Sequence, residues 1–164
     1  MSCDGIGTRT HFDYVTSSAT TYYYRYNLMG DVIALLNSTG AVCAEYEYSP
    51  YGEPLNYGLM TYSIGNINPF RYKGYYYDTE TGLYYLQSRY YDPTICRFIS
   101  ADAVEFLGAT GTLLSLNLYA YCENNPINKI DNTGNVVTPA NVVGAAIGAV
   151  IGEVVVITLL KPED

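Results

Sequence analysis

Short runs of apolar and aromatic residues, separated by turn residues, fill the first hundred positions of the chain. Ala41–Tyr48 alternates between apolar or aromatic residues and cysteine or glutamate, which is the two-residue period of a strand with unlike faces. Similar runs at Tyr22–Tyr26 and Val32–Leu36 precede turn signals that contain glycine. Strand-like runs separated by glycine turns indicate a meander of β-hairpins. Over residues 22–100 we therefore expect antiparallel hairpins, with turns at Gly30, Gly40, Gly52 and Gly82.

The remaining segments differ in how clearly they predict structure. Residues 1–21 are polar without periodicity, and residues 53–70 contain many prolines, glycines and asparagines, so we expect irregular structure in the first segment and loops in the second. The same pattern predicts strands at Arg71–Tyr77, Leu83–Tyr91 and Thr94–Ile99. Leu113–Tyr121 fits a short helix or a strand.

The composition supports a sheet and excludes several classes of protein. The 164 residues include 20 tyrosines and no tryptophan, and tyrosine favours strands with one half-wet face. Because only 15% of the residues are charged and 49% are hydrophobic, a disordered acidic tail is not expected. The net charge of −8 leaves no cationic surface for phosphates, so we expect no nucleic acid as partner.

Few residues are available for metal or nucleophilic chemistry. The chain has one histidine, His11, and four widely spaced cysteines that form no C-x-x-C pair, so we expect no metal site and no cofactor. Buried free thiols are favoured over two disulfides, since each cysteine lies among apolar or aromatic residues. The first residues contain no apolar segment typical of a signal peptide.

Two longer segments carry a family resemblance. Residues 24–52, YRYNLMGDVIALLNSTGAVCAEYEYSPYG, resemble the last YD repeat of the RHS/YD-repeat family. Residues 70–98, FRYKGYYYDTETGLYYLQSRYYDPTICRF, resemble the start of that family's RHS-repeat-associated core domain, and residues 116–131, LNLYAYCENNPINKID, resemble its end. The chain is thereby identified as a member of this family over roughly residues 22–135.

The resemblance implies an architecture. Family members wind a spiral β-sheet into a hollow shell, the core domain closes one end, and a variable C-terminal region, usually a toxin, lies inside. We therefore divide the chain into an irregular segment (1–21), a terminal YD-type repeat (22–69), the core domain (70–135) and an apolar glycine-rich tail (136–164). Because neighbouring strands stabilise one another in such a spiral, the first strand of this single repeat is expected to be an unpaired edge.

The resemblance also implies self-cleavage. Many family members cut their own chain after a D-P-x-G-L motif with paired aspartates, of which one is held protonated while the other activates water. Asp102 and Asp131 match the two aspartates, which places the cut between Asn135 and Val136. Ala103, Asn132 and Asn135 depart from the motif's prolines and leucine. These departures slightly favour the alternative that both aspartates cap turns.

Other polar and aromatic residues have two interpretations. Arg71, Arg89 and Arg97 could orient a carboxylate, but stacking on aromatic rings or pairing with Asp78 or Asp92 is favoured. The tyrosines could bind sugars through ring stacking, but packing between repeats is favoured. Two functions therefore remain: the end cap of a toxin-enclosing β-shell, at most autoproteolytic, or a non-enzymatic cell-surface or carbohydrate-binding module.

The tail combines signals for helix, strand and membrane. Thr138 and Pro139 fit the start of a helix, and Gly144, Gly148 and Gly152 recur every four residues in the apolar run 140–160. We expect a glycine-rich helix over about 139–151 that packs on a partner, with membrane contact through 139–160 as the alternative. The resemblance places the toxin segment after this point, whereas the sequence ends at Asp164. We therefore expect a truncated member or a terminal fragment, and a secreted or cell-surface location as in the family.

Overall fold

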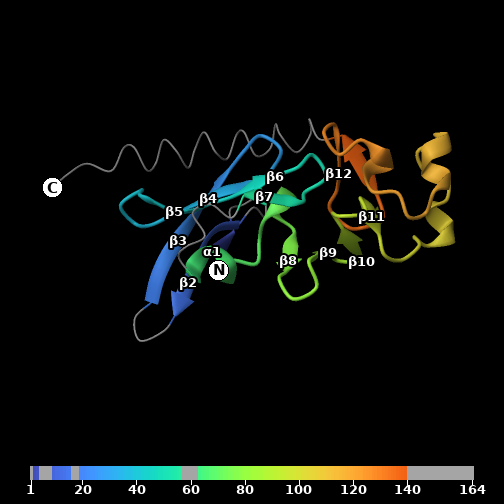
Figure 1. Cartoon of the computed structure of the whole chain (residues 1–164). Helices are drawn as coiled ribbons and strands as arrows, with labels where there is room; N and C mark the ends of the chain where they lie inside the picture. The colour runs from blue at the N-terminus through green and yellow to red at the C-terminus, as the bar shows by residue number, and fades with distance from the viewer. Residues whose placement is uncertain (1, 4–8, 16–18, 57–62, 140–164) are drawn as a thin grey trace.

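The structure is a computed structural model, and it describes residues 2–3, 9–15, 19–56 and 63–139. Short antiparallel strands dominate these residues and follow one another along an elongated body (Figure 1). The strands are β1 (Ser2–Cys3), β2 (Arg9–Val15), β3 (Ala19–Tyr26), β4 (Val32–Leu36), β5 (Val42–Glu45), β6 (Glu47–Tyr48), β7 (Pro54–Asn56), β8 (Tyr76–Asp78), β9 (Leu83–Leu86), β10 (Arg89–Asp92), β11 (Arg97–Phe98), β12 (Lys129–Asp131) and β13 (Val137–Pro139). The helical turns are α1 (Ser63–Ile67), η1 (Tyr72–Gly74), η2 (Val104–Phe106), η3 (Leu113–Leu116) and η4 (Cys122–Asn124).

The first sheet has the order β1-β2-β3-β4-β5, with every pair antiparallel. The predicted mainly-β hairpin fold is confirmed, and the turn glycines Gly30, Gly40, Gly52 and Gly82 all have positive φ. The expectation of irregular structure before residue 22 is not met, because β2 occupies part of that segment and pairs with β3. The predicted first strand is therefore not an edge. Its exposed backbone groups recruit a neighbour whose sequence carries little periodicity of its own.

The second sheet has the order β11-β10-β9-β8 and differs in detail from the sequence prediction. Leu83–Tyr91, predicted as one strand, is a hairpin of β9 and β10, because Gln87 adopts a positive φ of 64° and turns the chain. Arg71–Tyr77 contains the helical turn η1 before β8, and within Thr94–Ile99 only β11 is a strand. The segment that fitted helix or strand forms the short turn η3.

Buried side chains form two clusters that follow the two sheets. The first cluster is Tyr24, Val32, Leu35, Ala44, Tyr46, Ile64 and Phe70. The second cluster is Tyr72, Tyr75, Tyr84, Leu86, Tyr91, Phe98, Tyr121, Cys122 and Ile130. The second cluster joins β9–β11 to η4 and β12, and thus sets the position of the segment that follows β12.

Buried tyrosines satisfy their hydroxyls with backbone carbonyls. Tyr84 donates to Gly52 O at 2.9 Å, Tyr91 to Tyr51 O at 2.7 Å, and Tyr75 to Asp131 O at 2.8 Å. Burial raises the pKa of all three hydroxyls, so they remain neutral donors. These tyrosines pack the core, as the packing interpretation predicts.

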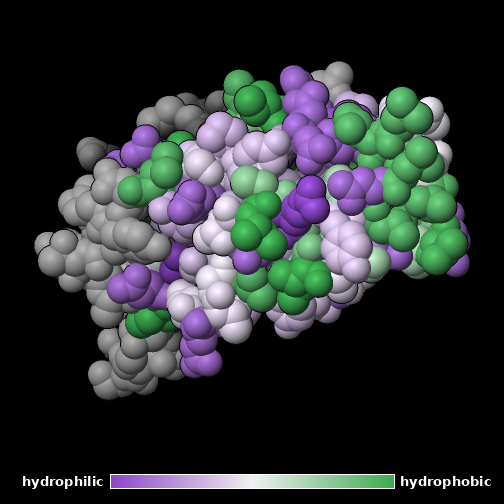
Figure 2. All heavy atoms as spheres, turned by 45° about the vertical axis from the view of Figure 1, so that its right-hand side comes forward, coloured by the Kyte–Doolittle hydropathy of each residue, from purple (hydrophilic) through white to green (hydrophobic). Residues whose placement is uncertain are grey.

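An exposed apolar patch covers the end of the body formed by η2 and η3, where Figure 2 shows hydrophobic side chains gathered. Leu113 is 86% and Val104 75% exposed. Large apolar patches of this kind mark surfaces that contact another chain or segment. The other exposed apolar residues in and beside η2 and η3, which complete this η2–η3 patch, are Leu107, Leu114 and Leu116.

The cysteines whose side chains are described are free, and the described start of the tail is a strand. Cys43, Cys96 and Cys122 are free, which excludes two disulfides, but only Cys122 is buried. Val137–Pro139 forms strand β13, so Thr138 and Pro139 do not begin a helix. The predicted tail helix and its membrane contact otherwise lie outside the described residues, and no described helix is long and apolar enough to span a bilayer.

Candidate functional site

The two aspartates singled out by the sequence meet at one guanidinium group. Arg89 Nη2 lies 2.8 Å from Asp102 Oδ2 and 3.7 Å from Asp131 Oδ2. The three side chains are almost completely withdrawn from solvent, with 6%, 9% and 0% of their surfaces exposed. The site therefore holds two carboxylates around one cation.

Three parts of the chain place these groups. Arg89 begins β10 and lies over the Phe98 ring, with Cζ 3.6 Å from the ring centroid. Leu118 O accepts from Arg89 Nη1 at 2.8 Å and from the backbone N–H of Asp102 at 2.9 Å. Asp131 ends β12, so its position follows from the pairing of β12 and β13.

The turn after β12 uses one oxygen of Asp131 and leaves the other without a hydrogen bond. Oδ1 accepts the backbone N–H groups of Thr133 at 3.2 Å, Gly134 at 2.7 Å and Asn135 at 3.2 Å. Oδ2 is buried and has no hydrogen-bond partner among the described residues. Asp131 thus caps a turn, as the alternative interpretation predicts, and also directs an unused carboxyl oxygen toward Arg89.

Asn135 contacts the groups around both aspartates. Its amide nitrogen faces Asp102 Oδ1 at 3.0 Å and Gly134 O at 2.9 Å. This orientation follows from the hydrogen bonds, since Gly134 O can only accept. The same carbonyl accepts from Arg89 Nε, and Ser88 Oγ donates to Thr133 O at 2.8 Å. Asn135 is therefore held by the β9–β10 turn and by both carboxylates.

The bond between Asn135 and Val136 lies beside a hydroxyl group. The backbone N–H of Val136 points to Thr133 Oγ1 at 3.4 Å, and the same hydroxyl lies 3.5 Å from Asp131 Oδ1. Val136 is 47% exposed. The residue after the bond is thus half-exposed, and the Thr133 hydroxyl lies between the Val136 nitrogen and Asp131.

Burial sets the ionisation of the site. It raises the pKa of the Asp102 carboxyl, although the adjacent Arg89 acts in the opposite direction. It also raises the pKa of Asp131 against the effect of the backbone N–H of Gly134. Burial lowers the pKa of Arg89, which its two carboxylate neighbours counteract. Because the two carboxyls share one guanidinium, their titrations are coupled.

The raised pKa of Asp131 predicts a pH-dependent stability difference. A carboxyl whose folded pKa lies above its ordinary value of 3.8 stabilises the fold below that pH, and this contribution is lost as pH rises through the folded pKa. The free energy of unfolding of Asp131→Asn, measured by urea unfolding, should therefore rise relative to that of the wild type as pH rises from about 4 to about 7. Asp78→Asn is the control, since hydrogen bonds from Glu80 N–H and Thr81 lower the pKa of Asp78. Its stabilising contribution is present above the ordinary value of 3.8 and is lost only as pH falls below it, so the difference between Asp78→Asn and the wild type should stay nearly constant from about pH 4 to about pH 7. Parallel curves for wild type and Asp131→Asn would contradict this account.

Arg89 is the residue whose role the sequence prediction misjudged. It stacks on an aromatic ring as expected, but it pairs with Asp102 and Asp131 instead of Asp78 or Asp92. Arg71 stacks on Tyr77 at 4.4 Å, in line with the favoured interpretation. Nothing in the sequence indicated that Ser88 and Thr133 belong to the site. Ser88 is one of two polar residues within an aromatic run, and Thr133 is a hydroxyl residue in the turn of the motif.

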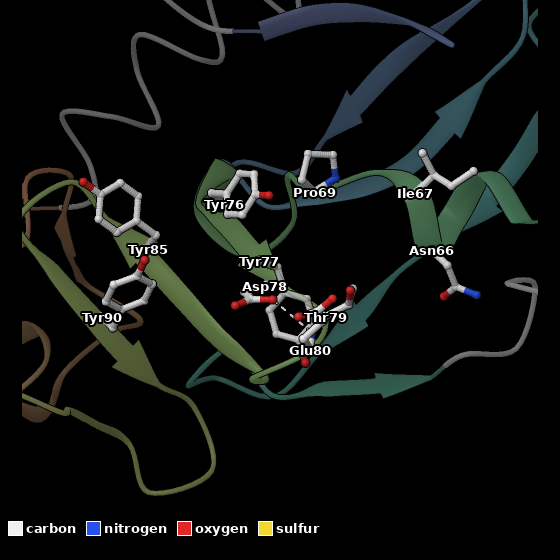
Figure 3. A pocket seen from close by; sticks show the side chains of 10 residues that line it. All are labelled: Asn66, Ile67, Pro69, Tyr76, Tyr77, Asp78, Thr79, Glu80, Tyr85 and Tyr90. Atoms are coloured by element: carbon white, nitrogen blue, oxygen red, sulfur yellow. Dashed lines mark hydrogen bonds between the residues drawn. The ribbon is translucent and has the colours of Figure 1, made fainter. Parts of the chain in front are cut away.

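Half-exposed tyrosines also line an open pocket of about 710 Å³ (Figure 3). Tyr85 and Tyr90 form a ring pair with centroids 5.1 Å apart. Asp78, one of the carboxylates that line the pocket, already accepts hydrogen bonds from Glu80 N–H at 3.0 Å and from the Thr81 hydroxyl at 2.9 Å within its own turn. The described lining of the pocket shows no pair of buried carboxyls around a cation, so the aspartate pair is the stronger candidate site for cleavage chemistry. Among the described residues no group of histidine, cysteine and carboxylate side chains could hold a metal ion.

Comparison with known proteins places the chain among shell-forming proteins. Residues 7–127 match the family model described as Teneurin YD-shell. The tRNA nuclease WapA of Bacillus subtilis strain 168 is 43% identical over 116 residues, which are 70% of this chain and 5% of WapA. The toxin subunit YenC1 of Yersinia entomophaga is 35% identical over 101 residues, covering 62% of this chain and 10% of YenC1.

Solved structures agree with these relatives. The crystal structure of TcdB2-TccC3 is similar with a TM-score of 0.62 and 34% identity, over 73% of this chain and 5% of that chain. A crystal structure of TcdB2-TccC3 without its hypervariable C-terminal region gives a TM-score of 0.58 at the same identity. The chain thus spans about one twentieth of WapA and of the solved chain.

Proposed function

The chain belongs to the YD-shell family of RHS/YD-repeat proteins, and on this premise we propose that it forms the end cap of a toxin-enclosing β-shell and cuts its own backbone after Asn135. The cap assignment is supported by relatives that are toxin subunits or a nuclease and by the hypervariable C-terminal region of TccC3. We expect the longer protein to be exported or presented at the cell surface, with its variable segment after residue 135.

The exposed η2–η3 patch supports a cap within a larger body. Val104 and Leu113 are largely exposed among the described residues, and η2 and η3 lie at one end of the molecule (Figure 1). In the assembled protein the upstream shell repeats are the partner that buries this patch. The contact is apolar, as expected for a permanent interface between parts of one chain.

The observation that carries self-cleavage is the convergence of Asp102, Asp131 and Asn135. Asp102 Oδ1 lies 3.0 Å from the Asn135 amide, and Asp131 Oδ1 lies 3.2 Å from the Asn135 backbone nitrogen. Asp102, with Arg89 at 2.8 Å, is the carboxylate and takes a proton from the nucleophile. Asp131 keeps its proton on Oδ2, the oxygen that no described backbone N–H contacts, and gives it to the departing Val136 nitrogen, beside which the Thr133 hydroxyl lies. Arg89 positions both carboxyls.

The cut would leave the downstream segment attached. Residues Val137–Pro139 pair with β12 on the upstream side of the same molecule, and Thr138 Oγ1 lies 3.4 Å from Ile130 O. A segment severed before Val136 therefore stays in place until the cap opens. This arrangement suits a shell that holds its toxin after processing.

Intact mass of freshly purified protein tests the proposal. Wild type should yield a fragment ending at Asn135 and one beginning at Val136, which separate in denaturant and elute together in native buffer. Asp131→Asn should remain uncut, because the proton donor is lost, while the exposed-turn control Asp78→Asn should be cut as wild type. A wild-type chain that remains whole over days, or cleavage unchanged by Asp131→Asn, would refute the aspartate mechanism.

A further inference from the structure

We propose that the nucleophile in this cleavage is the side-chain amide of Asn135 itself, which closes a succinimide ring and releases Val136 without consuming water. The inference rests on the proposed self-cleavage and replaces the water of the family reaction by a group of this chain. It explains the presence of asparagine where the resemblance calls for leucine.

The side chain of Asn135 is tied to the reacting groups. Its Nδ2 lies 3.0 Å from Asp102 Oδ1 and 2.9 Å from the Ser88 hydroxyl. Five-membered ring closure joins Nδ2 to the carbonyl carbon of the same residue, so the nucleophile is covalently held next to its target. Such intramolecular attack reaches effective concentrations that free water does not match, on the order of 10⁵ M or more for well-oriented groups.

The proton balance closes within the site. The Nδ2–C bond of Asn135 forms and the C–N bond to Val136 breaks. Asp102 takes one proton from Nδ2. Asp131 gives the proton held on its Oδ2, the oxygen that has no hydrogen-bond partner among the described residues, to Val136 N, beside which Thr133 Oγ1 lies at 3.4 Å. One proton is thus moved from Nδ2 to the departing amine, and no co-reactant is required. The upstream fragment ends in a succinimide that water opens later.

Three of the four carboxyl oxygens at the site are already engaged by protein groups. Asp131 Oδ2 is buried without a hydrogen-bond partner, and Asp131 Oδ1 is occupied by three backbone N–H groups. Asp102 faces Arg89 through one oxygen and Asn135 through the other. The base that would activate water is therefore already in contact with the amide.

The experiment compares product masses of the full chain, purified rapidly at mildly acidic pH to preserve the imide. We expect an upstream fragment lighter by one water than the fragment that ends in a free Asn135 carboxylate. When this fragment is later incubated in heavy-oxygen water, the imide should open and the fragment should gain the mass of one heavy-oxygen water. Asn135→Leu should abolish cleavage, whereas Asn132→Leu, an exposed control in the same turn, should preserve it. Thermal unfolding checks that each variant folds, and Asn135→Gln, which keeps the amide but not the five-membered ring, should also lose cleavage.

The outcomes separate this inference from the proposed function. A fragment that carries the hydrolytic mass from the earliest time, together with cleavage of Asn135→Leu, would overturn the succinimide and leave the aspartate-dependent cut intact. A wild-type chain that stays whole would overturn both. Imide formation that persists in Asp102→Asn would remove Asp102 as the base.

Discussion

Replacing Arg89 by methionine is expected to lower the free energy of unfolding by about 3–5 kcal/mol, since it removes the cation from two buried carboxyls. Arg89 contacts Asp102 at 2.8 Å and also donates to Leu118 O at 2.8 Å. Urea unfolding at neutral pH measures the loss. The exposed Arg97 on neighbouring β11 gives the control, because Arg97→Met should change stability by no more than about 0.5 kcal/mol.

Charge compensation sharpens this test. In Arg89→Met the two carboxyls remain buried without a counter-charge, so adding Asp102→Asn and Asp131→Asn should restore part of the lost stability. Recovery identifies unpaired charge as the cause of the loss. If the triple variant is less stable than Arg89→Met alone, packing of the arginine on Phe98, and not its charge, holds the site together.

A methyl group at Gly134 is expected to cost about 1–3 kcal/mol beyond the penalty for its backbone conformation. Gly134 has φ of 78°, and an added Cβ would lie 2.6 Å from Leu86 O, a backbone atom of the β9–β10 hairpin. The turn would have to move away from Arg89, so Gly134→Ala should also stop self-cleavage. Thermal unfolding and intact mass report the two effects.

Gly111 provides a closely matched control. Its φ is 74°, and an added Cβ would meet nothing within 4 Å. Gly111→Ala should therefore show only the conformational cost of about 1–2 kcal/mol and keep its cleavage. Equal destabilisation of the two variants would mean that the turn shifts freely and that its contact with the hairpin does not position Asn135.

The local sequence pattern was sufficient to predict the strands that are joined by turns containing glycine. Gly40 and Gly82 lie in turns as predicted, because no other residue adopts positive φ at so low a cost. The turn at Gln87 escaped prediction because its positive φ is imposed by tertiary contacts, with Ser88 N–H bound to Leu86 O at 2.7 Å and to Thr133 O at 3.2 Å. Strand β2 escaped for a similar reason, since pairing with β3 defines it.

The sequence identified the two aspartates of the site but not how the residues of the site are arranged in space. The motif resemblance selected Asp102 and Asp131, yet nothing in the spacing indicated that Arg89, 13 and 42 positions earlier in the chain, would lie between them. The contact with Asp131 depends on the packing of β10 against the segment between η4 and β13, and the contact with Asp102 depends on Leu118 O, which accepts from both Arg89 and Asp102. The turn-capping and catalytic interpretations, which the sequence set against each other, use different oxygens of the same Asp131 side chain.

Quantifying the cut chain on one denaturing gel tests the central claim most directly. The full chain, extended after Asp164 by a folded reporter domain, is compared with its Asp102→Asn and Asp131→Asn variants at equal times after purification. We expect the wild-type chain to be cut between Asn135 and Val136. Both variants should remain uncut and should still unfold cooperatively. A folded wild-type protein that remains uncut, or variants cut as fast as the wild type, would contradict this claim.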